Sequence, residues 1–279
     1  MKKGHTFKLC KKPIVSFGIL CYKRIKEKMY FLLIQRKDSM GFIDFVRGKY
    51  GNNDTETTKL QTLKIFIEEM TSHEKHRLLN SPFDELWDSL WLNKDSRTYL
   101  NDKEDAKKKF SKLDLQNLLN NTETKWDYQE YGIPKGRRMN QMEGDIDCSS
   151  REFKEETGIG HMDYIIRHDL QPVTENFLGS NGVTYKHVYF LAEYIGSTAP
   201  RVDKKDKIQA GEVKSVGWFT LKESFEILRE YDTAKKHAIL EAWIVLRDAD
   251  EDSDDFSRYR ATPTTSTTTT SYSLEEEFR

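Results

Sequence analysis

Three glutamates fall within five consecutive positions of the segment REFKEETGIG, residues 151–160. In an α-helix, which turns about 100° per residue, Glu155 and Glu156 lie within about 60° on either side of Glu152. Carboxylate oxygens gathered on one helix face suit a hard divalent cation, because Mg²⁺ prefers carboxylate and phosphate oxygens. The alternative is a solvated acidic face, since like charges at i and i+4 cost a helix only roughly a few tenths of a kcal/mol.

The neighbouring residues supply what a helix needs in order to present that face. Gly158 follows at the point where a left-handed C-cap would end the helix, and Asp145 or Asp147 is suited to cap its start. A separate stripe, about 60° wide, suits packing against a core; it consists of Ile146, Ser150, Phe153 and Thr157. The sequence therefore predicts an amphipathic helix with a buried stripe beside a carboxylate face that has no basic partner of its own.

The bulk composition limits the classes of protein to which the chain can belong. Its 279 residues suffice for one large domain or two small ones. A net charge of −1, from 45 Lys and Arg against 46 Asp and Glu, argues against a globally basic nucleic-acid binder. Three cysteines without metal-type spacing, Cys10, Cys21 and Cys148, indicate free thiols in a reducing compartment.

The N-terminal region raises the question of a targeting segment. Its basic start and apolar run resemble part of a signal peptide, but the run is short and no small-residue cleavage site follows, so we predict a first strand. No other apolar run is long enough to span a bilayer. We therefore expect a cytoplasmic protein.

Hydrophobic patterning divides the chain into three parts. Residues 14–36 are predicted to form a β-hairpin, and the pattern then becomes helical. Strand patterns return around the turn Ser180-Asn181-Gly182 and again in EVKSVGWFTL, before a closing helix. We predict an α/β domain interrupted by a helical insertion and followed by a disordered acidic and threonine-rich tail. The corresponding ranges are 1–38 with 126–248, then 39–125, and 249–279.

The clearest helix of the insertion is predicted in SPFDELWDSLWL, residues 81–92. Ser81 is the expected N-cap, with Pro82 in the first turn. Trp87 and Trp91 recur at helical spacing with two leucines and are expected to lie in a core, although an exposed tryptophan pair would stack a base.

Residues 132–159, GIPKGRRMNQMEGDIDCSSREFKEETGI, resemble the Nudix box. That motif is a glycine, five residues, a glutamate, seven residues and then REUxEExGU, where U is aliphatic or aromatic. Glu143 stands seven residues before Arg151, and residues 151–159 match every invariant position. Six residues rather than five separate Gly136 from Glu143, and the additional residue falls in a loop, where insertions are tolerated best. The resemblance implies an α/β/α sandwich with a mixed sheet, of the α+β class.

The resemblance also implies roles for individual residues. It assigns Mg²⁺ or Mn²⁺ to the Gly136 carbonyl and to Glu152, Glu155 and Glu156, while Glu143, like Gly158, shapes the box. The implied catalytic set is Glu152, Glu156, Glu212 and Arg151, with Arg151 also pairing with Glu143 and with Glu156 or Glu212 taking a proton from water. Lys135 and Arg137 are the implied substrate contacts. Glu212, in GEVKSVGWF, is equally well explained as an ordinary loop carboxylate.

Two segments outside the box narrow the resemblance. RKDSMGFIDFVRGKY, residues 36–50, and YKHVYFLA, residues 185–192, look like parts of the mRNA-decapping Nudix proteins of large cytoplasmic DNA viruses. That resemblance covers roughly residues 14–245. It implies release of 7-methyl-GDP from capped mRNA, in the host cytoplasm, with the insertion as the RNA-binding element.

Other functions share the same motif. A hydrolase of diphosphoinositol polyphosphates or dinucleoside polyphosphates is the main alternative, and a non-catalytic RNA-binding module is the third. The insertion holds 14 Lys and Arg against 15 Asp and Glu, so an RNA surface must come from local clustering. The run Lys107-Lys108-Lys109 is one such cluster, and a solvated helix face is the other interpretation.

Overall fold

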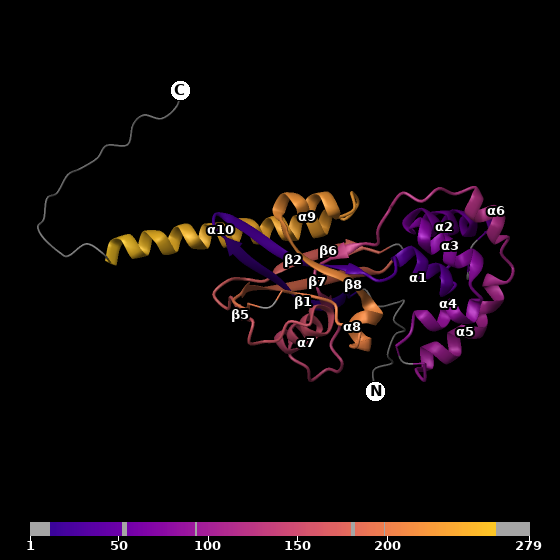
Figure 1. The fold of residues 1–279 in the computed structure, drawn as a ribbon, viewed down its shortest axis with the longest axis horizontal. Coiled ribbons are helices and arrows are strands. Elements are labelled where there is room, and N and C mark those ends of the chain that lie inside the picture. The colour runs from indigo at the N-terminus through magenta and orange to yellow at the C-terminus, as the bar shows by residue number, and fades with distance from the viewer. Residues whose placement is uncertain (1–11, 52–54, 93, 180–181, 198, 261–279) are drawn as a thin grey trace, which may run out of the picture.

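The computed structural model describes residues 12–51, 55–92, 94–179, 182–197 and 199–260, with side chains up to residue 249. A mixed sheet with helices on both faces forms one part, and a group of helices lies beside one end of that sheet (Figure 1). The strands are β1 (Ile14–Ile25), β2 (Lys28–Arg36), β3 (Tyr131–Gly132), β4 (Lys135–Gly136), β5 (Tyr164–Ile166), β6 (Val173–Leu178), β7 (Thr184–Tyr194) and β8 (Val213–Thr220). The helices are α1 (Met40–Val46), α2 (Glu56–Glu69), α3 (Ser72–Asn80), α4 (Phe83–Ser89), α5 (Arg97–Phe110), α6 (Leu115–Asn120), α7 (Asp145–Thr157), α8 (Lys207–Glu212), α9 (Leu221–Ile227) and α10 (Thr233–Arg260).

The sheet is mixed, as the resemblance to the Nudix box implies. Its path runs β3-β2-β1-β7-β5, while β4, β6 and β8 pair with β1, β7 and β2. Strands β1 and β7 are parallel, and the other pairs are antiparallel. The predicted hairpin at residues 14–36 is confirmed by the antiparallel pairing of β1 with β2.

Alternation along the strands determines which helix covers which face of the sheet, because successive side chains of a strand point to opposite faces. Leu20 and Tyr22 pack with the α10 residues Ile239 and Ala242. Ile19 and Cys21 pack on the opposite face with the α7 residue Phe153 and with Ile159 just beyond that helix. The result is the α/β/α sandwich that the resemblance implies (Figure 1).

Helices α1 to α6 pack around a core of their own. That core is rich in aromatic residues, and its buried members include Phe42, Phe45, Phe66, Phe83, Trp87 and Phe110. Trp87 is fully buried and Trp91 packs against the same core at a ring-centroid distance of 5.4 Å, which leaves Trp87 unavailable to stack a base. The expected Ser81 cap is wrong, because Pro82 occupies the N-cap position of α4 and no side chain caps it.

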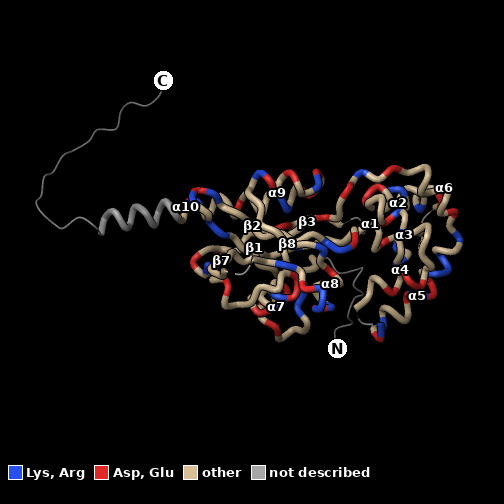
Figure 2. The backbone as a smooth tube through the Cα atoms, viewed as in Figure 1, with Lys and Arg blue, Asp and Glu red and all other residues tan. Residues whose placement is uncertain are grey.

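Acidic neighbours balance the lysine run of α5. Lys107 and Lys103 contact Asp84 at 2.6 and 3.1 Å, and Lys109 contacts Asp105 at 2.8 Å. Blue and red segments are correspondingly interspersed over these helices (Figure 2). Much of the positive charge of this cluster is therefore neutralised within the protein.

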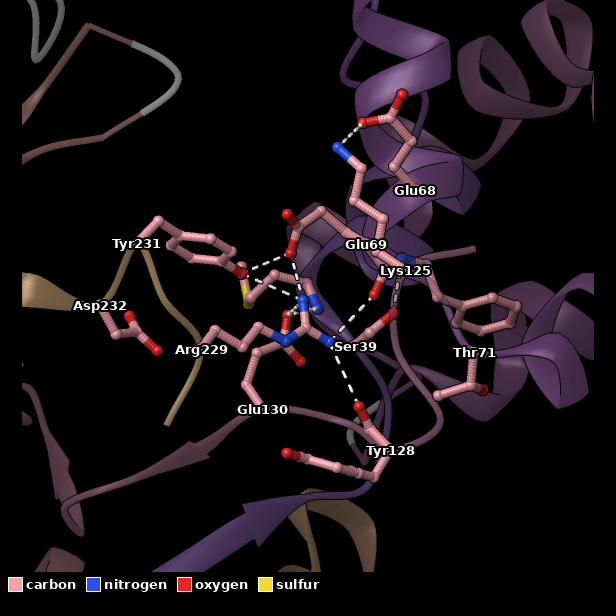
Figure 3. Close-up of polar contacts among 12 residues, drawn as sticks. Ser39, Glu68, Glu69, Thr71, Lys125, Tyr128, Glu130, Arg229, Tyr231 and Asp232 are labelled. Carbon is pink, nitrogen blue, oxygen red and sulfur yellow. Dashed lines mark hydrogen bonds and ion pairs between the residues drawn. The ribbon is translucent and has the colours of Figure 1, made fainter. Parts of the chain in front are cut away.

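A buried arginine connects the helices of the insertion to the sheet domain (Figure 3). Arg229, which is 1% exposed, pairs with Glu69 of α2 and contacts Glu130 Oε1 at 3.2 Å. Its guanidinium also donates to the backbone carbonyls of Glu69, at 3.0 Å, and Tyr128, at 3.3 Å. The same Glu130 oxygen accepts the Met40 N–H at 3.0 Å, so the beginning of α1 is bound to this network as well.

The C-terminal prediction is wrong in part. Helix α10 continues to Arg260, so residues 249–260 are helical rather than disordered, and residues 261–279 lie outside the described part. Cys21 and Cys148 are buried free thiols, while Cys10 lies outside the described residues. No helix within the described ranges combines the length and apolar character needed to cross a membrane.

Candidate active site

Helix α7 presents the glutamate face, and its packing stripe holds it against the sheet. Phe153 is fully buried and contacts Tyr164 edge-on at 5.1 Å between ring centroids. Gly158 ends the helix with φ at 73°, a left-handed value that glycine adopts without strain. The expected Asp145 or Asp147 cap is wrong: Gly144 is the N-cap residue and no side chain caps the helix, although both aspartates stand in its first turn.

The three glutamates of α7 have different surroundings. Glu156 is buried, and its Oε2 accepts the backbone N–H of Lys135 at 2.8 Å. Burial raises the pKa of Glu156 to about 7, Lys135 opposes the rise, and Glu212 and Glu152 add to it. Burial also raises the pKa of Glu152, and the hydrogen bond and charge of Arg151 oppose that rise. Glu155 lies between them in sequence, with its side chain 34% exposed.

Arg151 connects the loop to the helix. Its Nε donates to Glu143 Oε1 at 2.8 Å, and its Nη2 donates to the Arg137 carbonyl at 2.9 Å. Its Nη1 donates to Glu152 at 2.8 Å and to Glu155 at 3.3 Å. The expectation that the carboxylate face lacks a basic partner is therefore wrong, because Arg151, four residues before Glu155, reaches forward along the same helix.

Gly136 lies directly against the helix despite the longer loop. It pairs with Phe17 through β4, and a Cβ at this position would fall 2.0 Å from the Glu152 carboxylate. Only glycine leaves room for that approach. The six residues between Gly136 and Glu143 therefore do not displace the glycine from the glutamates, and the Met139 N–H donates to Glu143 Oε2 at 2.6 Å within the loop.

The donor chemistry of this face fits a hard divalent cation, since carboxylate and carbonyl oxygens are its preferred ligands. Within the described ranges, no three His, Cys, Asp or Glu side chains converge closely enough to hold a metal ion as they stand. The contacts explain why. Arg151 occupies oxygens of Glu152 and Glu155, while the Lys135 N–H occupies one oxygen of Glu156.

Glu212 is the last residue of the short helix α8 and not a loop residue. Its backbone carbonyl accepts the Lys37 N–H at 2.9 Å, which holds it beside the end of β2. Its carboxylate raises the pKa of both Glu152 and Glu156, after the larger effect of burial. The structure therefore places Glu212 within electrostatic range of the α7 glutamates, and no hydrogen bond of its carboxylate is present among the described residues.

The basic residues near this face differ in accessibility. Lys135 is half-buried, and burial lowers its pKa, an effect that Glu156 opposes. Arg137 is exposed. Arg138 forms an ion pair with Asp145 and lies over the Phe17 ring at 4.8 Å. The side chains of Lys135 and Arg137 are therefore available to bind a ligand, whereas Arg138 is occupied by its ion pair with Asp145.

Arg36 is a charged residue of the site that we did not predict from the sequence. It lies at the irregular end of β2, where the register with β8 shifts, and its Nε is buried without a hydrogen-bond partner in the described part of the chain. Its positive charge acts on Glu212 and Lys135. A half-buried cation without a bonded counter-ion beside carboxylates is an expected feature of an anion-binding site. The only sequence signal is its position at the end of a strand.

Comparison with known proteins gives the viral mRNA-decapping proteins that residues 36–50 and 185–192 resemble. A protein of Acanthamoeba polyphaga mimivirus, provisionally named an mRNA-decapping protein, is 30% identical over 251 residues, which are 81% of this chain and 67% of that protein. The mRNA-decapping protein g5R of African swine fever virus, Kenya isolate, is 30% identical over 170 residues. That match covers 58% of this chain and 64% of the g5R protein, slightly less than two thirds of its length.

Solved structures with low identity also match. A Caenorhabditis elegans Ap4A hydrolase binary complex has a TM-score of 0.40 and 13% identity, over 82% of this chain and 98% of that chain. The Nudix domain of Shewanella oneidensis NrtR complexed with ADP ribose has the same TM-score and identity, over 86% and 94%. No protein-family model matches the chain. On the strength of its similarity to the mimivirus protein, the chain belongs to the family of viral mRNA-decapping proteins.

Proposed function

We propose that this protein is a divalent-metal-dependent Nudix hydrolase that removes the 5′ cap of mRNA in the host cytoplasm, releasing 7-methyl-GDP and 5′-monophosphate RNA. The observation that supports this most directly is the glutamate face of α7, with Gly136 against Glu152 and Arg151 bonded to Glu143. Membership of the viral decapping family supports the choice of substrate.

Glu152, Glu155, Glu156 and the Gly136 carbonyl would hold Mg²⁺ or Mn²⁺. When bound, such an ion polarises a phosphoryl oxygen and lowers the pKa of water. Arg151 holds Glu152 and Glu155 on one side of the helix. Its hydrogen bond to Glu143 would keep the guanidinium in place when Glu152 and Glu155 rotate away from it to bind the metal ion. We assign proton abstraction from the attacking water to Glu212, because Glu156 is assigned to the metal and the Glu212 carboxylate has no hydrogen bond among the described residues.

We assign the substrate phosphates to the cations opposite these carboxylates. Lys135 and Arg36 are half-buried, and neither side chain has a hydrogen bond or ion pair among the described residues. Arg137 is exposed and follows Lys135 by two residues in the chain. Cations in a partly dehydrated site bind phosphate oxygens more strongly than solvated surface charges do.

Replacing Arg36 with Ala should raise KM for capped RNA by about tenfold or more, because a charge-assisted hydrogen bond contributes roughly 1.5–3 kcal/mol. The kcat should fall less, since the chemistry is performed by other residues. Steady-state kinetics on cap-labelled RNA measures both constants. Arg97→Ala, an exposed arginine of α5, is the matched control, and an unchanged KM in the Arg36 variant would contradict the phosphate assignment.

The activity itself is tested by parallel incubation with cap-labelled RNA, a dinucleoside polyphosphate and a diphosphoinositol polyphosphate. We expect 7-methyl-GDP from capped RNA in the presence of Mg²⁺ or Mn²⁺ and none after chelation with EDTA. Turnover of only the small substrates would instead support the diphosphoinositol or dinucleoside polyphosphate hydrolase. Binding of RNA without hydrolysis of any of the three would indicate a non-catalytic module.

A further inference from the structure

Gln209 is a buried polar residue to which the proposed function gives no role. It lies in α8 and is 2% exposed. Its side-chain amide nitrogen donates to the backbone carbonyl of Glu156 at 3.3 Å and to that of Arg201 at 3.1 Å. Its amide oxygen accepts the Asp203 N–H at 2.7 Å. Each of the three hydrogen bonds of this side chain ends on a backbone group outside α8.

The Glu156 contact is the notable one, because this carbonyl belongs to the last turn of α7. The final carbonyls of a helix have no partner within the helix and must be satisfied from outside. Gln209 supplies that partner from a segment 53 residues further along the chain. The bond therefore sets the distance between the end of α7 and helix α8.

Two further contacts hold the other end of α8. The Glu212 carbonyl accepts the Lys37 N–H at 2.9 Å. Leu92 of the insertion lies so close to Gly211 that a Cβ there would fall 2.3 Å from Leu92 Cδ2. Helix α8 is thus held between the end of α7 on one side, and β2 and the insertion on the other.

We propose that Gln209 is a positioning residue that sets Glu212 against the glutamates of α7, with Leu92 supporting α8 from the insertion; this inference rests on the proposed function. Gln209 and Glu212 stand at i and i+3 in one short helix, so they move as a unit. A displacement of about 1 Å at a catalytic group is enough to lower a rate severely. The insertion, through Leu92, then supports catalysis as well as any RNA contact.

The test uses the full-length protein and steady-state hydrolysis of cap-labelled RNA with Mn²⁺. Gln209→Met keeps the length of the side chain and removes the amide, and we expect kcat to fall about tenfold with KM changed less than about twofold. Gln116→Met, an exposed glutamine of α6, is the matched control and should leave both constants unchanged. Leu92→Ala changes a residue that is 49% exposed, so the loss of buried area is small, and it should lower kcat by about threefold.

The decisive measurement is the double variant. If Gln209 acts through Glu212, then Gln209→Met should lower kcat no further in a Glu212→Gln background, because residues that act as a unit are not additive. Leu92→Ala should show the same lack of additivity, which keeps the test valid if the Gln209 variant does not fold.

Three outcomes distinguish a failure of the positioning role of Gln209 from a failure of the proposed hydrolase function. If the kcat of the double variant falls by the product of the two single-variant decreases, the positioning role is overturned and the proposed hydrolase activity is not affected. Wild-type kcat in Glu212→Gln would likewise overturn the positioning role, because Glu212 would then have no catalytic part. Absence of metal-dependent hydrolysis by the wild-type protein would overturn the proposed function itself.

Discussion

Replacing Glu156 with Gln should reduce the hydrolysis of capped RNA by about a hundredfold or more, since the change removes one proposed metal ligand from the glutamate face. The fold should survive. The Gln side chain keeps an oxygen that can accept the Lys135 N–H, now accepted by Glu156 at 2.8 Å, so this backbone donor keeps its partner. The loss should therefore appear in kcat with an unchanged circular dichroism spectrum.

Glu241→Gln is the matched control, because Glu241 is an exposed glutamate of α10 on the far face of the sheet. Both variants are measured at equal protein concentration across a range of Mn²⁺ concentrations. Recovery of the Glu156 variant at high Mn²⁺ would indicate weakened metal affinity. Full activity at every concentration would exclude Glu156 from the site.

Replacing Arg229 with Met should destabilise the protein by about 3–5 kcal/mol, because it leaves buried carboxylates without their cation. The Glu130 side chain is only 10% exposed and the Glu69 side chain 23% exposed, and both pair with Arg229 at the junction in Figure 3. Two backbone carbonyls would also lose their donor, those of Glu69 and Tyr128. Urea denaturation measures the free energy of unfolding, with the exposed Arg97→Met as control.

The decrease in the free energy of unfolding caused by Arg229→Met should depend on pH. Burial already raises the pKa of Glu130, and Arg229 opposes that rise, so its removal raises the folded-state pKa further. A carboxyl whose folded pKa exceeds its unfolded pKa loses stability as pH rises above the unfolded value, which is about 4.3. The destabilisation should therefore be larger at about pH 8 than at about pH 5, and a deficit independent of pH would show that charge burial is not its cause.

Helix α7 illustrates what local sequence determines. Three features of the helix depend on residues within one or two helical turns: the spacing of its glutamates, the packing position of Phe153 and the glycine after Thr157. Helical periodicity and the position of that glycine therefore predict the helix, its buried stripe and its left-handed end. The hairpin at residues 14–36 follows for the same reason, since a short polar turn joins two strand patterns. These features depend on neighbours close in the chain.

The environment of each glutamate was decided by tertiary structure. Glu155 and Glu156 are adjacent in sequence, yet only Glu156 is buried and bonded to Lys135, because β4 passes over one side of α7. The balanced charge of the insertion, likewise, left open which lysines were paired, and Lys107 proved to contact Asp84 from a different helix. Periodicity specifies a face, but it does not specify what covers that face.

Gln209 and Arg229, which we did not predict from sequence, share one property: their partners are distant in the chain. Gln209 bonds Glu156 across 53 positions, and Arg229 pairs with Glu69 across 160. No local pattern marks such a residue, because a glutamine or arginine in a polar segment looks the same whether it is solvated or buried. By itself the sequence determined the helix, its carboxylates and the family; only the packing of remote segments decided how those carboxylates are held, because burial and ion pairing are properties of the assembled chain.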